Sequence, residues 1–452
     1  VELPEARAQL ETALQMTKST ANLYQQIRIL LALGSVAVAE GHAMEAEQDA
    51  TQAIELARAN GMENQATGGL TWLGNSFLWK GDYTEAEKYY QEALELARRN
   101  NGHLNEAIAL VQLGSLRTLQ HKTDEGARYV EQALPFLQRA GYRKWVSLAV
   151  TLLGRIYRDK GDYEAALKSF KEQLQLGEAL DDSSQVALSH LEIGNVLSDQ
   201  EHYLEALHHF DEGYKIFRSL KAEMYTGYAI NNLASVLWQI GRYEEARAAL
   251  DEASSIANRP DGAYKQLLAD ILVVGALLDL SNGHFRESEA KSRQALALAG
   301  TQFDDTIVQA KFALGLAQAR SGATRAGRLL CDEAVNAATG TGDPKLISAA
   351  ALASAEALLE SGEAQGALEV ALRTQVTLAR FGKEDSEWRA WLIAARASER
   401  LGDATAARQY ATQAVTRLAN LEQEWGAEAY NGYLARQDIQ RFHQQLDQLP
   451  KP

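Results

Sequence analysis

Proline and cysteine are both scarce in this chain of 452 residues. Proline occurs only at positions 4, 135, 260, 344, 450 and 452, so long helices can form with few interruptions. The single cysteine, Cys331, excludes a disulfide framework and favours a reducing compartment, which makes the cytoplasm the expected location. The sequence has neither a signal peptide nor an apolar run of 18 or more residues, so no membrane-spanning segment is expected.

Positive charge is also in short supply. The 60 Asp and Glu residues outnumber the 45 Lys and Arg residues, which gives a formal net charge of −15. An array that binds nucleic acid needs a basic stripe to displace counterions from phosphates. An anionic membrane surface would repel this chain because both carry negative charge. We therefore expect neither nucleic acid nor a membrane as a partner.

Motifs for catalysis and for metal binding are missing as well. His202, His208 and His209 cluster, but Glu205 with His208 makes a single Glu-x-x-His pair, and a carboxylate-bridged di-metal site needs two. The glycines of segment 340–345 suggest a phosphate loop, yet the Gly-Lys-Ser/Thr ending and a preceding strand are lacking. We therefore expect no enzyme, no catalytic residue, no metal site and no cofactor.

What the chain does contain is a glycine that returns about every forty residues, followed five residues later by another small residue. At two places the beat continues without glycine, at His121 and Glu201. A fixed period of this length marks a solenoid, and apolar residues three, four and seven apart on both sides of the glycine predict paired amphipathic helices. The glycines are Gly41, Gly81, Gly161, Gly241, Gly283, Gly322, Gly362 and Gly402, and the small residues are Ala46, Ala86, Ala166, Ala246, Ser288, Gly327, Ala367 and Ala407.

The second repeat shows the full pattern of a Leu-Gly pair, a Gly-x-Tyr turn, an alanine, an aromatic residue and a further alanine. This pattern resembles the tetratricopeptide repeat, and the resemblance extends from about residue 25 to residue 418. The repeat is about six residues longer than the usual 34, as in the arrays of Pins/LGN spindle-orientation adaptors, kinesin light chains and bacterial signalling regulators. The residues that carry it are Leu73, Gly74, Gly81, Tyr83, Ala86, Tyr90 and Ala93.

The resemblance implies an all-α, right-handed α-solenoid, a superhelix of about ten helical hairpins with C-terminal capping helices. Residues 1–24 are expected to hold the second helix of an incomplete repeat, and residues 25–258 to form repeats one to six, the expected binding segment. Residues 259–420 are expected to form the Ala-rich repeats seven to ten. Residues 421–452 do not fit the repeat and are expected to cap the last apolar face.

In the family, the first helix of each repeat lines the concave face, at fixed offsets from the Leu-Gly pair. Asparagine amides there suit the backbone of an extended peptide, two arginines suit a carboxylate, and aromatic rings can act as anchors. Each of these side chains could instead be solvated or bonded within the array. The predicted partner-binding residues are Thr71, Asn75, Trp79, Thr151, Arg155, Arg158, Asn195, Tyr228, Asn231 and Trp238.

The expected function is therefore a scaffold that binds a protein or peptide in the concave groove, as one module of a larger, bacterial protein. Leu31 and Ser35 occupy the positions of the lysine and asparagine that clamp chaperone C-termini in other arrays, so that ligand is not expected. Two alternatives stay open. One is a ligand-sensing array that controls a kinase, protease or DNA-binding effector outside this sequence, and the other is a module for homodimer formation.

Overall fold

The structure is a computed structural model that describes residues 3–20, 22–39, 43–79, 82–258 and 264–449. Within these residues the chain forms 22 helices and no strand, so the all-α class is confirmed. The turn glycines Gly41 and Gly81, together with the Pro-Asp-Gly connector at 260–262, lie outside the described residues.

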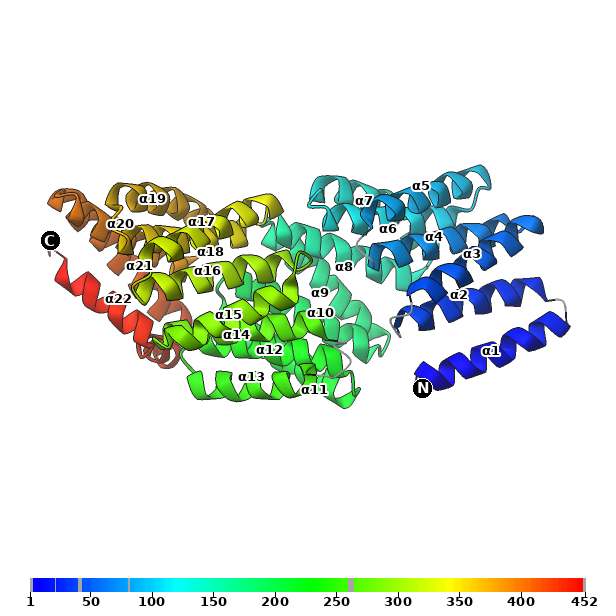
Figure 1. Ribbon diagram of the computed structural model, residues 1–452, viewed down its shortest axis with the longest axis horizontal. Coiled ribbons are helices and arrows are strands. Elements are labelled where there is room, and N and C mark those ends of the chain that lie inside the picture. The colour runs from blue at the N-terminus through cyan, green and yellow to red at the C-terminus, as the bar shows by residue number, and fades with distance from the viewer. Residues whose placement is uncertain (1–2, 21, 40–42, 80–81, 259–263, 450–452) are drawn as a thin grey trace. The chain divides into compact units, whose positions relative to one another are not determined.

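The helices pack into two compact units, unit 1 (residues 1–156) and unit 2 (residues 157–452). In each unit the helices stack as successive antiparallel pairs, the first and second helix of a repeat (Figure 1). The helices up to the boundary are α1 Leu3–Ser19, α2 Leu23–Ala39, α3 Ala43–Ala59, α4 Glu63–Trp79, α5 Tyr83–Arg99, α6 His103–Leu119, α7 Thr123–Arg139 and α8 Arg143–Asp159, which runs across it.

The remaining helices belong to unit 2, and the even-numbered helices α2 to α20 are the first helices of the ten repeats. The solenoid is confirmed, whereas the right-handed superhelix and the four expected segments stay predictions. These helices are α9 Tyr163–Ala179, α10 Ser183–Asp199, α11 Tyr203–Ser219, α12 Glu223–Gln239, α13 Tyr243–Ala257, α14 Lys265–Ser281, α15 Phe285–Ala299, α16 Asp304–Arg320, α17 Thr324–Thr341, α18 Pro344–Glu360, α19 Ala364–Arg380, α20 Glu384–Arg400, α21 Ala404–Leu434 and α22 Gln437–Gln448.

Helix ends follow from local residues. The Asp162 carboxylate accepts a hydrogen bond from the Ala165 backbone N–H (3.2 Å), and Asp403 does the same for Ala406 (2.9 Å), so each satisfies a free donor at the start of a second helix. The turns before these helices need a residue with positive φ. His121 (φ 57°) and Glu201 (φ 66°) adopt this conformation without glycine, so the predicted beat is kept where glycine is missing.

Close packing within a repeat depends on the glycine of the Leu-Gly pair. A Cβ atom on Gly74 would lie 2.5 Å from the Tyr90 ring, and the same contact recurs between Gly194 and Phe210. In repeat eight, Gly315 instead faces the buried Cys331, because a small residue takes the place of the aromatic ring. The later repeats thus use smaller side chains, and their first helices α14, α16, α18 and α20 contact one another directly.

The C-terminal segment departs most from the simple array. Helix α21 contains the second helix of repeat ten and continues past Gly426, whose φ of 75° and ψ of 165° break the helical geometry. Helix α22 then packs against α20 and α21. C-terminal helices are present as expected, but their buried side chains reach repeats other than the last one.

Candidate partner-binding faces

In unit 1, helix α4 carries three of the predicted residues. Thr71 is buried, and its hydroxyl donates to the carbonyl oxygen of Thr67 (3.1 Å). The hydroxyl of Tyr90 donates to Asn75 Oδ1 (2.6 Å), so this amide oxygen is used within repeat two. The side chain of Trp79 lies outside the described residues.

Helix α8 presents a more open face within unit 1. Thr151 is half-buried and Arg155 is exposed, and Lys144 and Leu148 share their side of the helix, because the spacing of the four residues alternates between four and three. The Leu148 side chain is 45% exposed. Lys144 and Leu148 are not among the predicted residues, because their spacing is typical of any amphipathic helix and carries no sign of a binding site.

Arg158 lies in a buried charge cluster of unit 2. Its Nε is 3.2 Å from Asp199 Oδ2, and Lys345 Nζ is 2.6 Å from Oδ1 of the same carboxylate. Burial alone would raise the pKa of Asp199, but Lys345 and Arg158 hold it below its ordinary value. Burial, partly offset by Arg158, raises the pKa of Asp159 to about 6. The guanidinium of Arg158 is thus engaged inside unit 2, and its contact with a partner stays a prediction.

The amides predicted on α10 and α12 are also enclosed. Asn195 Oδ1 accepts a hydrogen bond from Asn232 Nδ2 (2.8 Å), and burial raises the pKa of Tyr228 to about 12. Asn231 is only 5% exposed, and its Oδ1 has no hydrogen-bond partner in the described part of the chain. This oxygen can still accept a hydrogen bond, but only from a group that reaches the interior of unit 2.

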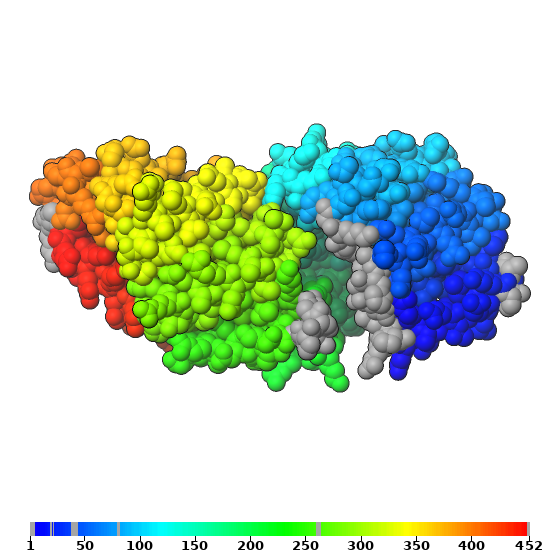
Figure 2. Space-filling model, viewed as in Figure 1, coloured from blue at the N-terminus to red at the C-terminus, as the bar shows by residue number. Residues whose placement is uncertain are grey.

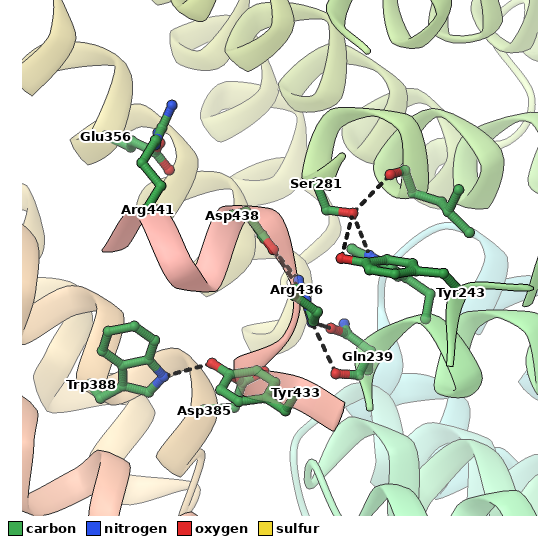
Figure 3. A network of polar contacts seen from close by, with 12 residues as sticks. Gln239, Tyr243, Ser281, Glu356, Asp385, Trp388, Tyr433, Arg436, Asp438 and Arg441 are labelled. Carbon is green, nitrogen blue, oxygen red and sulfur yellow. Dashed lines mark hydrogen bonds and ion pairs between the residues drawn. The ribbon is translucent and has the colours of Figure 1, made fainter. Parts of the chain in front are cut away.

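Trp238 is covered by the chain's own C-terminal segment, whose Arg436 is shown beside Gln239 in Figure 3. Its ring is 8% exposed, its Nε1 donates to Ser281 Oγ (3.0 Å), and the Arg436 guanidinium lies 5.2 Å from the ring centroid. Arg436 is itself 2% exposed, donates to the backbone and side-chain oxygens of Gln239 (3.0 Å each) and pairs with Asp438 (2.9 Å). An internal arginine therefore covers the predicted aromatic anchor.

Helix α22 extends this cover to three more first helices. Arg441 pairs with Glu356 on α18 (3.0 Å), and the Phe442 ring meets Trp388 on α20 edge-on, with centroids 6.2 Å apart. Arg320 on α16 lies over the same Phe442 ring. Burial alone would raise the pKa of Glu356, but Arg320 and Arg441 hold it at about 2. In Figure 2 the C-terminal atoms abut the yellow and orange atoms of the later repeats.

The start of α20 ties repeat ten to repeat five. The Tyr433 hydroxyl donates to Asp385 Oδ1 (2.5 Å) and accepts from Trp388 Nε1 (2.8 Å). The backbone N–H of Asp385 donates to Glu201 Oε2 (2.8 Å), so the carboxylate at the turn of repeat five caps a helix 184 residues further on. Burial and the Asp385 carboxylate raise the pKa of Glu201 to about 7. A glycine at position 201 would lose this cap.

Metal-binding geometry is not seen. No group of three or more His, Cys, Asp or Glu side chains within the described ranges is arranged to hold a metal ion. Among the clustered histidines, His209 pairs with His190, which lies outside the cluster in the sequence, and their Nδ1 atoms are 3.0 Å apart. Burial lowers the pKa of both imidazoles, that of His209 to about 4. None of the helices in the described residues has the length and apolar character needed to cross a bilayer.

Family models identify the repeat unit. One tetratricopeptide-repeat model matches residues 68–139 and 147–219, a second matches residues 226–259, and a third matches residues 31–103. The chain carries tetratricopeptide repeats. A comparison with curated proteins finds no match.

Solved tetratricopeptide-like arrays share the fold. A Rap protein complexed with competence and sporulation factor superposes with a TM-score of 0.59 at 14% identity, over 79% of this chain and 99% of that one. The apo form of RapI gives a TM-score of 0.52 at 16% identity, over 61% of this chain and 98% of the other. At these identities the likeness concerns the fold alone.

The matched tetratricopeptide repeats support a protein-binding repeat scaffold. The first helices of the two units differ in how far their faces are covered. In unit 2, the first helices α12, α16, α18 and α20 lie beneath the C-terminal segment. In unit 1, the face of α8 leaves Leu148 and two cations, Lys144 and Arg155, exposed.

Proposed function

We propose that the chain binds an extended segment of a partner protein on the first helices of unit 1, with α8 as the central contact. The exposed Leu148 between Thr151 and Lys144 carries the proposal. A partly exposed apolar side chain between a cation and a hydroxyl on a first helix can serve as an anchor for a partner. The predicted residues of repeats five and six, by contrast, already have partners or cover within unit 2.

The proposal places the scaffold in the cytoplasm, as one module of a larger bacterial protein. The single cysteine is buried, and burial raises the pKa of its thiol well above the ordinary range, so it has no reactive role that would require another compartment. The partner is a protein segment, because the family binds proteins and the chain is strongly acidic.

Selection from a displayed library of random twelve-residue peptides, followed by affinity measurement, tests the proposal. We expect enriched peptides to bind the wild-type chain and to lose at least about tenfold in affinity for Leu148→Asp, since a buried carboxylate replaces an apolar contact. Leu220→Asp is the matched control, because Leu220 is 42% exposed on a turn of unit 2. The proposal is wrong if no peptide is enriched, or if the two variants bind equally.

A ligand-sensing array is the second candidate, and the cover over unit 2 favours it. The Rap protein in the matched complex holds competence and sporulation factor, and here α22 lies on the first helices of unit 2 behind the Gly426 break. A ligand that replaced α22 would change the dimensions of unit 2, which small-angle scattering with and without selected peptides would detect. A homodimer would appear in the same samples as a doubled mass.

A further inference from the structure

The α8 region of unit 1 is basic in an otherwise acidic chain. Residues 132–156 contain no Asp or Glu at all, whereas the whole chain has 60 of them. The same stretch carries four cations, Arg139, Arg143, Lys144 and Arg155.

The three cations at the turn between α7 and α8 have no ion pair in the described part of the chain. Arg139, Arg143 and Lys144 are all exposed. At the ends of the two preceding second helices the arrangement differs, because Arg58 pairs with Glu92 and Arg98 pairs with Glu106. Unit 1 therefore pairs one arginine at each of these two helix ends, where Arg99 beside Arg98 stays without an ion pair within the described ranges, and pairs none of the three cations at the third.

Aromatic packing holds this turn in place. The Tyr142 ring lies 6.1 Å from that of Phe136, which lies 5.8 Å from the His103 ring. Tyr142 remains 38% exposed, so it adds an amphipathic ring beside the cations. A fixed turn presents its charges at low entropic cost to a ligand.

Two of these cations share one face of α8 with Leu148. Lys144, Leu148, Thr151 and Arg155 follow one face of α8 and span about 16 Å along its axis, the length of about five residues of extended chain. An apolar position thus lies between a cation at each end. The surface fits a segment in which acidic residues flank an apolar one.

We infer that the partner segment is an acidic peptide with a central apolar side chain, bound along Lys144, Leu148, Thr151 and Arg155 with Arg143 and Arg139 at its edge. This inference rests on the proposed function. Carboxylates meet arginine and lysine in charge-assisted hydrogen bonds, and the apolar residue covers Leu148. A nucleic acid would offer phosphates to the same cations, but the net charge of −15 repels a long polyanion.

The test uses the peptides selected from the random library and the full chain. Charge reversal in Arg143→Glu/Lys144→Glu is expected to weaken their binding at least about tenfold. The control Arg247→Glu/Arg286→Glu changes the net charge equally at two exposed arginines of unit 2 and should leave affinity unchanged. Wild-type affinity should also fall severalfold when salt is raised from about 50 to 300 mM, because exposed charges are screened.

The outcomes separate the inference from the proposed function. Enriched peptides that are acidic, and that lose affinity in Arg143→Glu/Lys144→Glu alone, support the inference. Neutral or basic peptides that still depend on Leu148 overturn it and leave the proposed function standing. A labelled random oligonucleotide that binds in place of peptides overturns it too, and a selection without any enriched peptide overturns both.

Discussion

Helices α8 and α12 are first helices of the same kind of repeat, yet their faces differ in exposure to solvent. Leu148 and Thr151 of α8 correspond in position to Tyr228 and Asn231 of α12. Leu148 is exposed, whereas Asn231 is buried and Trp238 further along α12 lies beneath Arg436. The C-terminal end of α12 is thus closed by a distant segment that folds back over it, which the residues of the repeat alone do not determine.

The two units also differ in the reach of their contacts. In unit 1, ion pairs join neighbouring repeats, such as Arg7 with Glu45 and Arg58 with Glu92. In unit 2, Arg436 bonds to Gln239 across 197 residues. The stability of unit 1 should therefore be close to a sum of the energies of its repeats and of the interfaces between neighbouring repeats. Unit 2, by contrast, should unfold as one cooperative block.

The largest expected effect comes from Arg436→Ala. The change leaves Asp438 buried without its cation, so we expect unit 2 to lose about 3–5 kcal/mol of unfolding free energy. Hydrogen exchange should show faster exchange in α12, α20 and α22 and no change in α4 and α6. The exposed Arg247→Ala is the control, and equal acceleration in both units would contradict the comparison.

Gly241→Ala should have the next largest effect. Gly241 has a φ of 81°, and a Cβ atom there would lie 1.9 Å from the carbonyl oxygen of Gly432. Gly402 is the matched control, because its φ is 84° and nothing lies within 4 Å of an added Cβ. Gly402→Ala should cost about 1 kcal/mol for the backbone conformation alone, and Gly241→Ala at least about 2 kcal/mol in denaturant unfolding. Equal losses would mean that the contact with Gly432 does not form.

The His190–His209 pair predicts a smaller, pH-dependent effect in unit 2. Both pKa values are lowered by burial, so the folded state favours neutral rings, and stability should fall as pH drops from about 6.5 towards 4. Lys171 and His208 oppose protonation of His209, while Glu212 favours protonation of both rings, and Glu178 favours that of His190. His209→Gln should make the melting temperature depend less on pH over this range. The exposed His284→Gln should leave the slope as in wild type, and an unchanged slope for His209→Gln would refute the assignment.

The smallest expected effect is on the stability of unit 1. Arg143 and Lys144 stand in the first turn of α8, where the helix dipole disfavours cations and no acidic residue is present. Arg143→Glu/Lys144→Glu should therefore raise the unfolding free energy of unit 1 by a few tenths of a kcal/mol to about 1 kcal/mol, measured in low salt. A clear loss of stability would show that these cations support the fold instead of serving a partner.

The sequence predicted the local features well because they depend on residues close together in the chain. The forty-residue period through His121 and Glu201 identified turns without glycine, and the spacing of apolar residues by three, four and seven identified both helices of each repeat. The cap from Glu201 to α20 was not predictable, since a carboxylate at a turn carries no sign of a partner 184 residues away.

The candidate site was predictable only in part for a related reason. Offsets within the repeat placed Thr151 and Arg155 on the first-helix face, but they could not show that Trp238 is covered by Arg436. Residues 421–452 were expected to cap the array because they do not fit the repeat pattern. Where their side chains pack depends on the path of all the repeats before them.

The position of Arg436 and Phe442 in the chain has a consequence for biosynthesis. A ribosome makes these residues after every repeat against which they pack, whereas each repeat of unit 1 can dock on its neighbour as soon as it emerges. During translation, the faces that carry Trp238, Trp388 and Glu356 therefore stay uncovered until the C-terminal segment has been made. We expect unit 1 to fold on the ribosome, and unit 2 to be the part of the nascent chain that binds chaperones.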